Sequence, residues 1–419
     1  MSDEFSKAEG RKQGRATLKP IASTAGPALM RQINRSILMN LVKLHEPVSR
    51  AQLAELTGMF RSTVSEIVKE LVSLGLVLET VGQPRGRGRV PVLLSLNNRS
   101  FWVIGVCVRP ERTDVALAGL GGKKERSISF PTPARPNQLL SQLSGAINQL
   151  REQPGCTTPL DVYRIGVGVP GRVDAAAGRM LGSAHLPAYA NFDMVAALEE
   201  RFGIPTEIQN DARLGALAEA SIEAAEEKDS GEFVFVQIAP EGVGGGIVID
   251  GELYNGHHET LAGEFGHMVV EANGPQCACG RRGCWELYVS DRATVRRYAP
   301  RSDPTDPQNR ERFWEAVSKR EPAAVKCLKE TARYIGIGLG NIVLTLDPAS
   351  MVIAGRVCKE WEIVFPIIDR AFAPAHLTIP VRRARLDTDD LYLQGSILLA
   401  VNAAFRQPEV GINVLAPAV

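Results

Sequence analysis

The sequence predicts an α/β protein in which a small helical N-terminal part precedes a larger part of alternating strands and helices. Apolar residues recur at helical spacing between residues 30 and 74, whereas short apolar strands alternate with helical segments from Trp102 onward. At 419 residues and 44% hydrophobic content, the chain is also too long for one core. We therefore expect two or three globular domains.

Charge is divided unevenly along the chain. Residues 1–99 hold fifteen Lys or Arg and eight Asp or Glu, which gives this part a net charge of +7. Because the whole chain has a net charge of +1, the remaining residues carry a net charge of −6. A basic N-terminal part on an acidic body indicates that only the N-terminal part meets a polyanion. No apolar run reaches the ~20 residues of a membrane helix, and the first residues lack a signal-peptide pattern. The expected location is the cytoplasm.

Residues 1–29 mix Ser, Lys, Arg, Gly and Pro without periodicity, and we expect a disordered basic tail there. A first helix is predicted from about Leu29 to Leu44. Its spacing assigns five apolar residues to one buried face: Ile33, Ile37, Leu38, Leu41 and Val42.

Two further helices follow a short connection. The second begins at the N-cap Ser49 and is stopped by Gly58, and the third runs from Arg61 to Leu74. Apolar spacing turns one face of the third helix to the core, namely Val64, Ile67, Val68 and Leu71. The polar residues at its start then remain exposed for contact with a nucleic acid: Arg61, Ser62, Thr63, Ser65 and Lys69.

A basic, glycine-rich tip follows the third helix. Leu76 and Val77 open a strand, residues 82–89 carry three glycine-separated arginines (Arg85, Arg87 and Arg89), and an apolar strand returns at Val92. We interpret this pattern as a β-hairpin wing that reaches a minor groove. Residues 30–98 thus predict a winged helix-turn-helix domain that binds double-stranded operator DNA. The alternative is a three-helix protein-interaction module whose charged stretch is a solvated loop.

Beyond residue 98 the pattern predicts alternating strands and helices. Expected strands are 102–108, 164–169, 206–209, 233–238, 246–250 and 351–354. Expected helices are 138–151, 193–202, 213–226 and 322–346. No internal repeat of fixed period is visible in the sequence.

Three of the seven cysteines are crowded into one short loop. Cys277, Cys279 and Cys284 are separated by one and four residues, and two intervening glycines permit tight turns. A closed structural Zn²⁺ site needs four ligands, and His267 lies ten residues upstream. We therefore predict a Cys₃His zinc site. The alternative is three reduced, unliganded cysteines.

Around this loop stand Glu264-Phe-Gly-His267, Cys284-Trp-Glu286 and a glycine run at 242–246. Together they resemble the ROK family of repressors, open reading frames and sugar kinases, and specifically regulators of the xylose and N-acetylglucosamine repressor type. The resemblance covers roughly residues 30–405. It implies a two-lobed, actin-like and sugar-kinase-like body, with a first lobe at 99–220 completed by a C-terminal helix at about 391–406. The second lobe would be 221–390, with the zinc loop at 267–284.

The same resemblance implies a sugar site and assigns residues to it. Gly171 ends the sugar-loop signature, and Asp211 stands where the family's kinases have their catalytic base. Carboxylates accept hydrogen bonds from vicinal hydroxyls, and Asn both donates and accepts. The expected sugar-binding residues are Gly171, Asn191, Asn210, Asp211, Glu264, His267 and Glu286.

Both phosphate loops depart from the kinase pattern. Kinases of the family carry Asp-x-Gly-Gly-Thr after the first strand, whereas residues 107–113 lack that motif and include Pro110, which has no NH donor. At the second loop, Glu241 places a carboxylate where an anion should bind. The prediction is therefore a regulator without enzyme activity.

We expect a DNA-binding transcriptional repressor of carbohydrate metabolism genes, working as a homodimer or homotetramer. A sugar would shift the population of lobe arrangements through its different affinity for the two states. The alternative is an ATP-dependent ROK kinase of a hexose or N-acetylhexosamine. A third possibility is a regulator that has lost its sugar and acts through protein partners.

Overall fold

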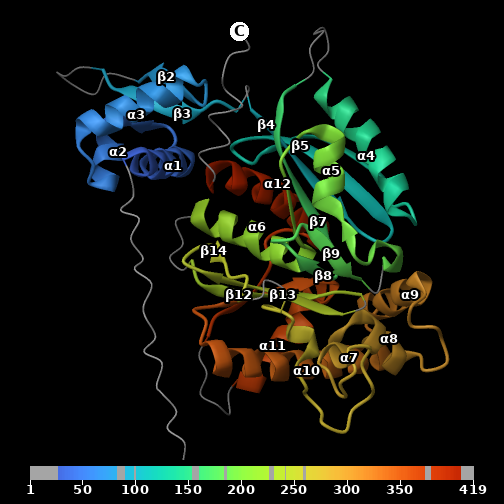
Figure 1. Ribbon diagram of the computed structural model, residues 1–419. Coiled ribbons are helices and arrows are strands. Elements are labelled where there is room, and N and C mark those ends of the chain that lie inside the picture. The colour runs from blue at the N-terminus through green and yellow to red at the C-terminus, as the bar shows by residue number, and fades with distance from the viewer. Residues whose placement is uncertain are drawn as a thin grey trace, which may run out of the picture.

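The computed structural model describes residues 27–82, 90–98, 101–152, 160–183, 186–225, 231–240, 242–257, 261–372 and 379–406. Most of the expected basic tail and the three arginines of the expected wing lie outside these residues, as does Glu241. Figure 1 shows a small N-terminal unit beside a large body that contains two sheets.

The N-terminal unit contains three helices and a three-stranded sheet of order β1-β3-β2. Its helices are α1 (Pro27–His45), α2 (Arg50–Thr57) and α3 (Arg61–Ser73). Its strands are β1 (Val48–Ser49), β2 (Val77–Val81) and β3 (Val92–Leu96). β2 and β3 pair antiparallel from Val77↔Leu96 to Val81↔Val92.

Local sequence signals explain where α2 begins and ends. The Ser49 side chain accepts from the backbone of Gln52, whose side chain bonds back to Ser49, which completes a capping box. Gly58 ends the helix with a φ of 68°, a conformation that favours glycine. The predicted bounds of the second and third helices are confirmed to within a residue or two.

The predicted buried face of the first helix is partly wrong. Leu38 and Val42 are fully buried, but Ile33 and Ile37 are 41% and 39% exposed. The core-facing stripe of α1 instead includes Met39, on the other side of Leu38. Residues spaced by three or four fit two adjacent stripes of one helix, so spacing alone did not decide which stripe is covered.

The first lobe of the body is built on a five-stranded sheet of order β11-β7-β4-β5-β6. Its strands are β4 (Trp102–Val108), β5 (Arg112–Gly119), β6 (Lys124–Pro131), β7 (Val162–Val169) and β11 (Thr206–Asn210). β4, β5 and β6 form an antiparallel meander, and β7 and β11 add parallel to β4.

A second five-stranded sheet has the order β14-β13-β12-β15-β16. Its strands are β12 (Phe233–Ile238), β13 (Val243–Ile249), β14 (Glu252–Leu253), β15 (Met351–Gly355) and β16 (Val381–Arg383). Here too a meander of three strands is extended by two parallel ones. The two sheets therefore share one topology, which makes the body an internal duplication that no sequence repeat had indicated.

Two helices, α6 (Asp211–Ala225) and α12 (Thr388–Arg406), lie between the two sheets, as Figure 1 shows. Glycines let them pack with backbone contact: a Cβ on Gly395 of α12 would lie 2.2 Å from the Leu214 carbonyl oxygen of α6. Buried residues of both helices share one core with the inner faces of the sheets and with the N-terminal unit.

The outer faces of the sheets are covered by separate helices. α4 (Pro136–Arg151) and α5 (Met194–Phe202) pack on the first sheet. The second sheet is covered by α8 (Asp291–Tyr298), α9 (Pro307–Ser318), α10 (Pro322–Leu346) and α11 (Trp361–Phe372). The body also contains the short helix α7 (Glu286–Val289) before α8, and the 3₁₀ turns η1 (Pro187–Tyr189), η2 (Phe265–His267) and η3 (Arg356–Glu360).

A small antiparallel sheet of β8 (Arg172–Asp174), β9 (Arg179–Gly182) and β10 (Phe192–Asp193) lies beyond the end of β7. All six strands and four helices predicted for the body are present, with ends displaced by at most a few residues. Within the described residues, no helix is both long and apolar enough to cross a membrane.

Candidate metal centre and carboxylate cluster

Four side chains from two adjoining segments meet at the edge of the second lobe. His267 ends the 3₁₀ turn η2, and the loop carrying Cys277, Cys279 and Cys284 leads into α7. Isolated bridges join Val269 to Cys284 and Gln276 to Arg282, so the loop folds back on the segment after His267. This fold brings ligands that are up to seventeen residues apart to one point.

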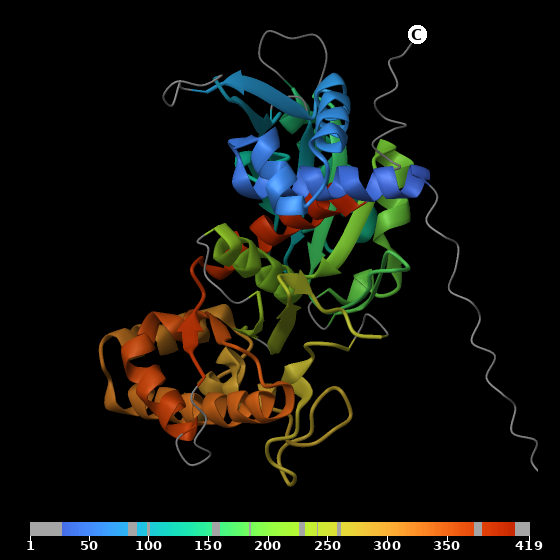
Figure 2. The ribbon, with the colours of Figure 1, turned by 90° about the vertical axis from the view of Figure 1, so that its left-hand side faces the viewer.

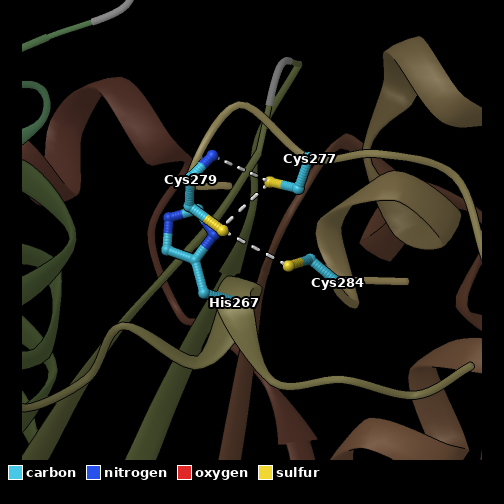
Figure 3. Close-up of side chains that lie close together, drawn as sticks. All are labelled: His267, Cys277, Cys279 and Cys284. Carbon is cyan, nitrogen blue, oxygen red and sulfur yellow. Dashed lines mark hydrogen bonds between the residues drawn. The ribbon is translucent and has the colours of Figure 1, made fainter. Parts of the chain in front are cut away.

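Figure 3 shows the imidazole and the three thiols directed toward one another. The Sγ atoms of Cys279 and Cys284 are 3.5 Å apart, and Cys277 Sγ lies 3.7 Å from His267 Nδ1. All four ligand atoms lie within 4.8 Å of one another. A tetrahedral ion with Zn–S bonds of about 2.3 Å separates its ligand atoms by about 3.7 Å. The donor set and its spacing therefore fit one zinc ion.

Two glycines make the turns of this loop possible. Gly280 has a φ of 90° and Gly283 a φ of 67°, both in the left-handed region. A Cβ on Gly283 would also lie 1.6 Å from the Glu271 carbonyl oxygen, an impossible contact. The backbone at residue 283 therefore admits only glycine, and the predicted role of these glycines is supported by the geometry.

Two carboxylates border the same imidazole. Glu286, the first residue of α7, has its Oε1 3.0 Å from Cys277 Sγ and 3.5 Å from His267 Nδ1. Glu264 Oε2 lies 3.9 Å from His267 Nε2 on the other side of the ring. Burial raises the pKa of Glu264, although His267 and Arg213 oppose the shift. Glu286 and Cys277 thus approach the same nitrogen of His267, Nδ1, while Glu264 lies at Nε2.

A second group of polar residues lies where β11 meets α6. The Asn210 amide donates to the Gly171 carbonyl oxygen at 2.9 Å and to Asp211 Oδ1 at 3.1 Å. Asn210 Oδ1 accepts from the amide of Ala212 at 3.0 Å, so its side chain is fixed in both directions. Desolvation raises the pKa of Asp211 to about 7, and the charge of Glu264 adds to the shift. Asp211, the first residue of α6, and Glu264, the residue before η2, are therefore electrostatic neighbours.

Tight packing connects these two groups. The Arg213 guanidinium donates to the Ala262 carbonyl oxygen at 2.7 Å and so holds the segment before Glu264 against α6. A Cβ on Gly244 would lie 2.5 Å from Ala212 Cβ, and one on Gly245 would lie 2.4 Å from the Phe265 ring. In this protein the glycine run of β13 is required for close packing against α6 and η2.

The remaining predicted residues are more dispersed. Asn191 lies in an exposed turn with a φ of 58°, and no hydrogen bond within the described residues links it to Asn210 or Asp211. At the start of α3, the predicted DNA-contacting residues are exposed or half-buried: Arg61, Ser62, Thr63, Ser65 and Lys69. Arg85, Arg87 and Arg89 lie outside the described residues.

Sequence reasoning missed an ion network at the turn between β4 and β5. Arg109, 13% exposed and directly after β4, pairs with Asp114 of β5 and with Asp389 in the first turn of α12. Arg112 adds contacts to both acids, at 3.0 and 3.2 Å. Burial opposes ionisation of Asp114, but bonds from Ser129 and Arg109 keep its pKa below the usual range. No local signal joins residues 109 and 389, which are 280 positions apart.

Comparison with known proteins places this geometry in a family. Residues 103–382 match the ROK family. The xylose repressor of Bacillus subtilis (strain 168) is 28% identical over 81% of this chain and 86% of its own. The "DNA-binding transcriptional dual regulator NagC" of Escherichia coli (strain K12) is also 28% identical, over 86% of this chain and 90% of its own.

Solved structures share the fold. A ROK family transcriptional regulator, a homologue of the E. coli MLC protein, aligns with a TM-score of 0.77 at 23% identity, over 92% of this chain and 99% of its own. The ROK hexokinase of Thermus thermophilus aligns with a TM-score of 0.62 at 27% identity, over 73% of this chain and 100% of its own. Because the family match spans both sheets and the whole cysteine loop, this chain belongs to the ROK family.

Proposed function

We propose that this protein is a sugar-responsive transcriptional repressor of carbohydrate metabolism genes. One observation carries the proposal: a ROK body with an ion network in place of its first phosphate loop is joined to a three-helix unit whose third helix exposes a polar face. The two regulators match 81% and 86% of the chain, whereas the hexokinase matches 73% of it. Two relatives carry the names xylose repressor and N-acetylglucosamine repressor, which supports a small sugar as the effector.

The cysteine cluster is proposed to hold a structural Zn²⁺ ion through His267, Cys277, Cys279 and Cys284. When bound, the ion supplies a fixed crosslink between η2 and the cysteine loop. His267 is three residues from Glu264 and borders Glu286, so the crosslink fixes both carboxylates in place.

The sugar is proposed to bind at Asp211, Asn210, Glu264 and Glu286, with Gly171 and Asn191 at its margin. Asp211 belongs to the first lobe and Glu264 to the second, so a sugar bonded to both prefers the arrangement in which they are close. Hydroxyl groups donate to such carboxylates, and the fixed Asn210 amide orients Asp211. Screening a sugar panel for shifts in thermal unfolding, followed by operator binding with each hit, tests the proposal directly.

The N-terminal unit is proposed to be a winged helix-turn-helix domain, residues 30–98, acting in pairs within a homodimer or homotetramer. Its support is the exposed polar start of α3, preceded by the glycine-ended helix α2, and the antiparallel β2 and β3. The body would comprise the two proposed lobes, with α12 completing the first.

We expect DNA binding to depend on the three arginines of the proposed wing. Replacing Arg85, Arg87 and Arg89 by Ala removes up to three phosphate or minor-groove contacts, so the slope of log K against log salt should fall by about 2 to 3. Fluorescence anisotropy over a salt series measures this slope. As a control, Ala at the exposed body residues Arg301, Arg312 and Arg333 removes the same charge. Equal slopes for the two triple variants would mean that the wing does not touch DNA.

We expect no phosphorylation of any sugar by ATP. Arg109 is committed to two acids, and Pro110 offers no amide to a phosphate. In a coupled assay over hexoses and N-acetylhexosamines, turnover should remain at background. A rate near the ~10 per second typical of enzymes would favour the kinase alternative.

Sugar affinity should rise as pH is raised from 6 to 8. The pKa of Asp211 is about 7, so its carboxyl is mostly protonated at pH 6 and mostly ionised at pH 8. If only the ionised form accepts the sugar hydroxyl, the apparent Kd falls about tenfold across this range. Calorimetry at several pH values checks the slope. Asp211→Asn keeps an acceptor for the Ala212 amide but cannot ionise, so its profile should be flat; a wild-type slope in that variant would contradict the assignment.

A further inference from the structure

The helix α12 touches a different part of the protein at each end. Its first turn carries Asp389, which pairs with Arg109 and Arg112, and the charge of Arg109 also acts on Asp211. Its last turn contacts α1 of the N-terminal unit, and Figures 1 and 2 both place α1 alongside that end of the helix. Nineteen residues at 1.5 Å each give a rod about 28 Å long.

The contacts at the last turn are specific and come from one face of α1. Ser36 Oγ donates to the Phe405 carbonyl oxygen at 2.5 Å, at a helix end where carbonyls lack intrahelical partners. Lys43 Nζ donates to Asn402 Oδ1 at 3.2 Å and lies 5.3 Å from the centre of the Phe405 ring. Burial lowers the pKa of Lys43 to about 8, while Glu252 of the second lobe opposes the shift.

Between its ends α12 is packed too closely to bend or turn independently. A Cβ on Gly166 of β7 would lie 2.1 Å from the Ser396 carbonyl oxygen, and one on Gly105 of β4 would lie 2.6 Å from Ile397 Cγ1. Backbone contacts of this kind tolerate little sideways displacement. Any displacement of the helix would therefore have to carry β4 and β7 with it.

A small cavity interrupts the packing around α1. It has a volume of about 50 Å³ and is lined by Ser36 and Leu71 of the N-terminal unit and by Tyr163 and Phe405 of the body. Beside it, the N-terminal unit and the body share one apolar core, and the polar contacts of Ser36 and Lys43 add to that core in holding α1 against α12.

We propose that α12 is a mechanical link in which the Asp389 ion pairs set the position of the helix and its last turn sets the position of α1. Asp389 and Lys43 are then positioning residues for the DNA-binding unit. The use of this link by a sugar at Asp211 rests on the proposed function, but the link itself does not. Ligand-driven changes around Arg109 would reach α1 without any contact between ligand and DNA.

Two adjacent acids offer a matched test. Asp389 pairs with Arg109 and Arg112, whereas the carboxylate of Asp390 lies 3.8 Å from the Lys124 Nζ atom. Asp389→Asn and Asp390→Asn remove the same charge from the same helix turn, so they share any effect on the helix dipole. The measurement is amide hydrogen exchange of the full-length protein, without sugar or DNA.

Asp389→Asn should accelerate exchange in residues 36–45 of α1 at least threefold, while Asp390→Asn leaves it unchanged. Exchange in β7 should be unaltered in both variants. Equal behaviour of the two variants in α1 would overturn the proposal. So would acceleration of α1 and β7 alike, because Asp389 would then only stabilise the fold.

A double variant tests the route of the effect. Lys43→Met removes the contact at the far end, so α1 should already exchange faster, and adding Asp389→Asn should produce little further change. Independent, multiplying effects of the two substitutions would contradict a single link. No sugar enters these measurements. The sugar panel can therefore give no hit while the exchange results support the link, and the exchange results can contradict the link while a sugar binds.

Discussion

Glu264→Ala is expected to abolish the sugar response while leaving operator binding intact. Glu264 borders His267 at 3.9 Å and is the second-lobe neighbour of Asp211, so the variant loses the acceptor that ties the sugar to the second lobe. Loss of one charge-assisted hydrogen bond costs about 2 to 3 kcal/mol, or roughly a hundredfold in affinity. A gel-shift titration with the best sugar from the panel measures the response.

The control for this variant removes an exposed glutamate that lies outside the carboxylate cluster, Glu311. Glu311→Ala removes an acid that pairs with Arg356, far along the chain from the carboxylate cluster. It should respond to sugar as the wild type does. A normal sugar response in Glu264→Ala would show that the sugar site is centred on other residues.

Cys279→Ser is expected to remove the metal and to destabilise the second lobe. The wild type should contain about one zinc per chain, because three thiolates and one imidazole complete a tetrahedral site. Structural zinc in small domains contributes about 10 kcal/mol or more of apparent binding free energy at neutral pH. Even a fraction of that value predicts a fall in Tm of more than about 10 °C. Metal analysis and thermal unfolding give the two readouts.

Cys358→Ser provides a control of the same chemistry. Cys358 lies in η3, bonds to the Ile353 carbonyl oxygen and is not part of the cluster. The variant should keep its zinc and nearly all of its stability. A folded wild-type protein that contains no metal, prepared without chelators, would refute the zinc site. Retention of full zinc by Cys279→Ser would remove Cys279 from the ligand set.

Much of the local structure was predictable from sequence because its signals are short in range. Ser49 and Gly58 bracket α2, and continuous apolar runs mark β4 and β12. The cysteine loop was predictable for the same reason: Cys277, Cys279 and Cys284 lie within eight positions, and the structure brings their thiols together with His267, as the proposed zinc site would require.

The carboxylate cluster was predictable only through the family resemblance. Nothing in the sequence around Asp211 or Glu264 states that the two residues, 53 positions apart, are electrostatic neighbours. Asn191 was likewise assigned through the resemblance, and its position in an exposed turn depends on how β9 and β10 pair, which the sequence does not show.

By itself the sequence determined the helical N-terminal part and the α/β body, the cysteine loop and the ends of the principal helices, all of which follow from periodicity and spacing within about twenty residues. The tertiary structure decided the duplicated strand order, the exposed side of α1 at Ile33 and Ile37, and the Arg109 pair with Asp389. These features depend on contacts between segments far apart in the chain. Such contacts are selected by the free energy of the whole packed core and leave no periodic trace in either segment.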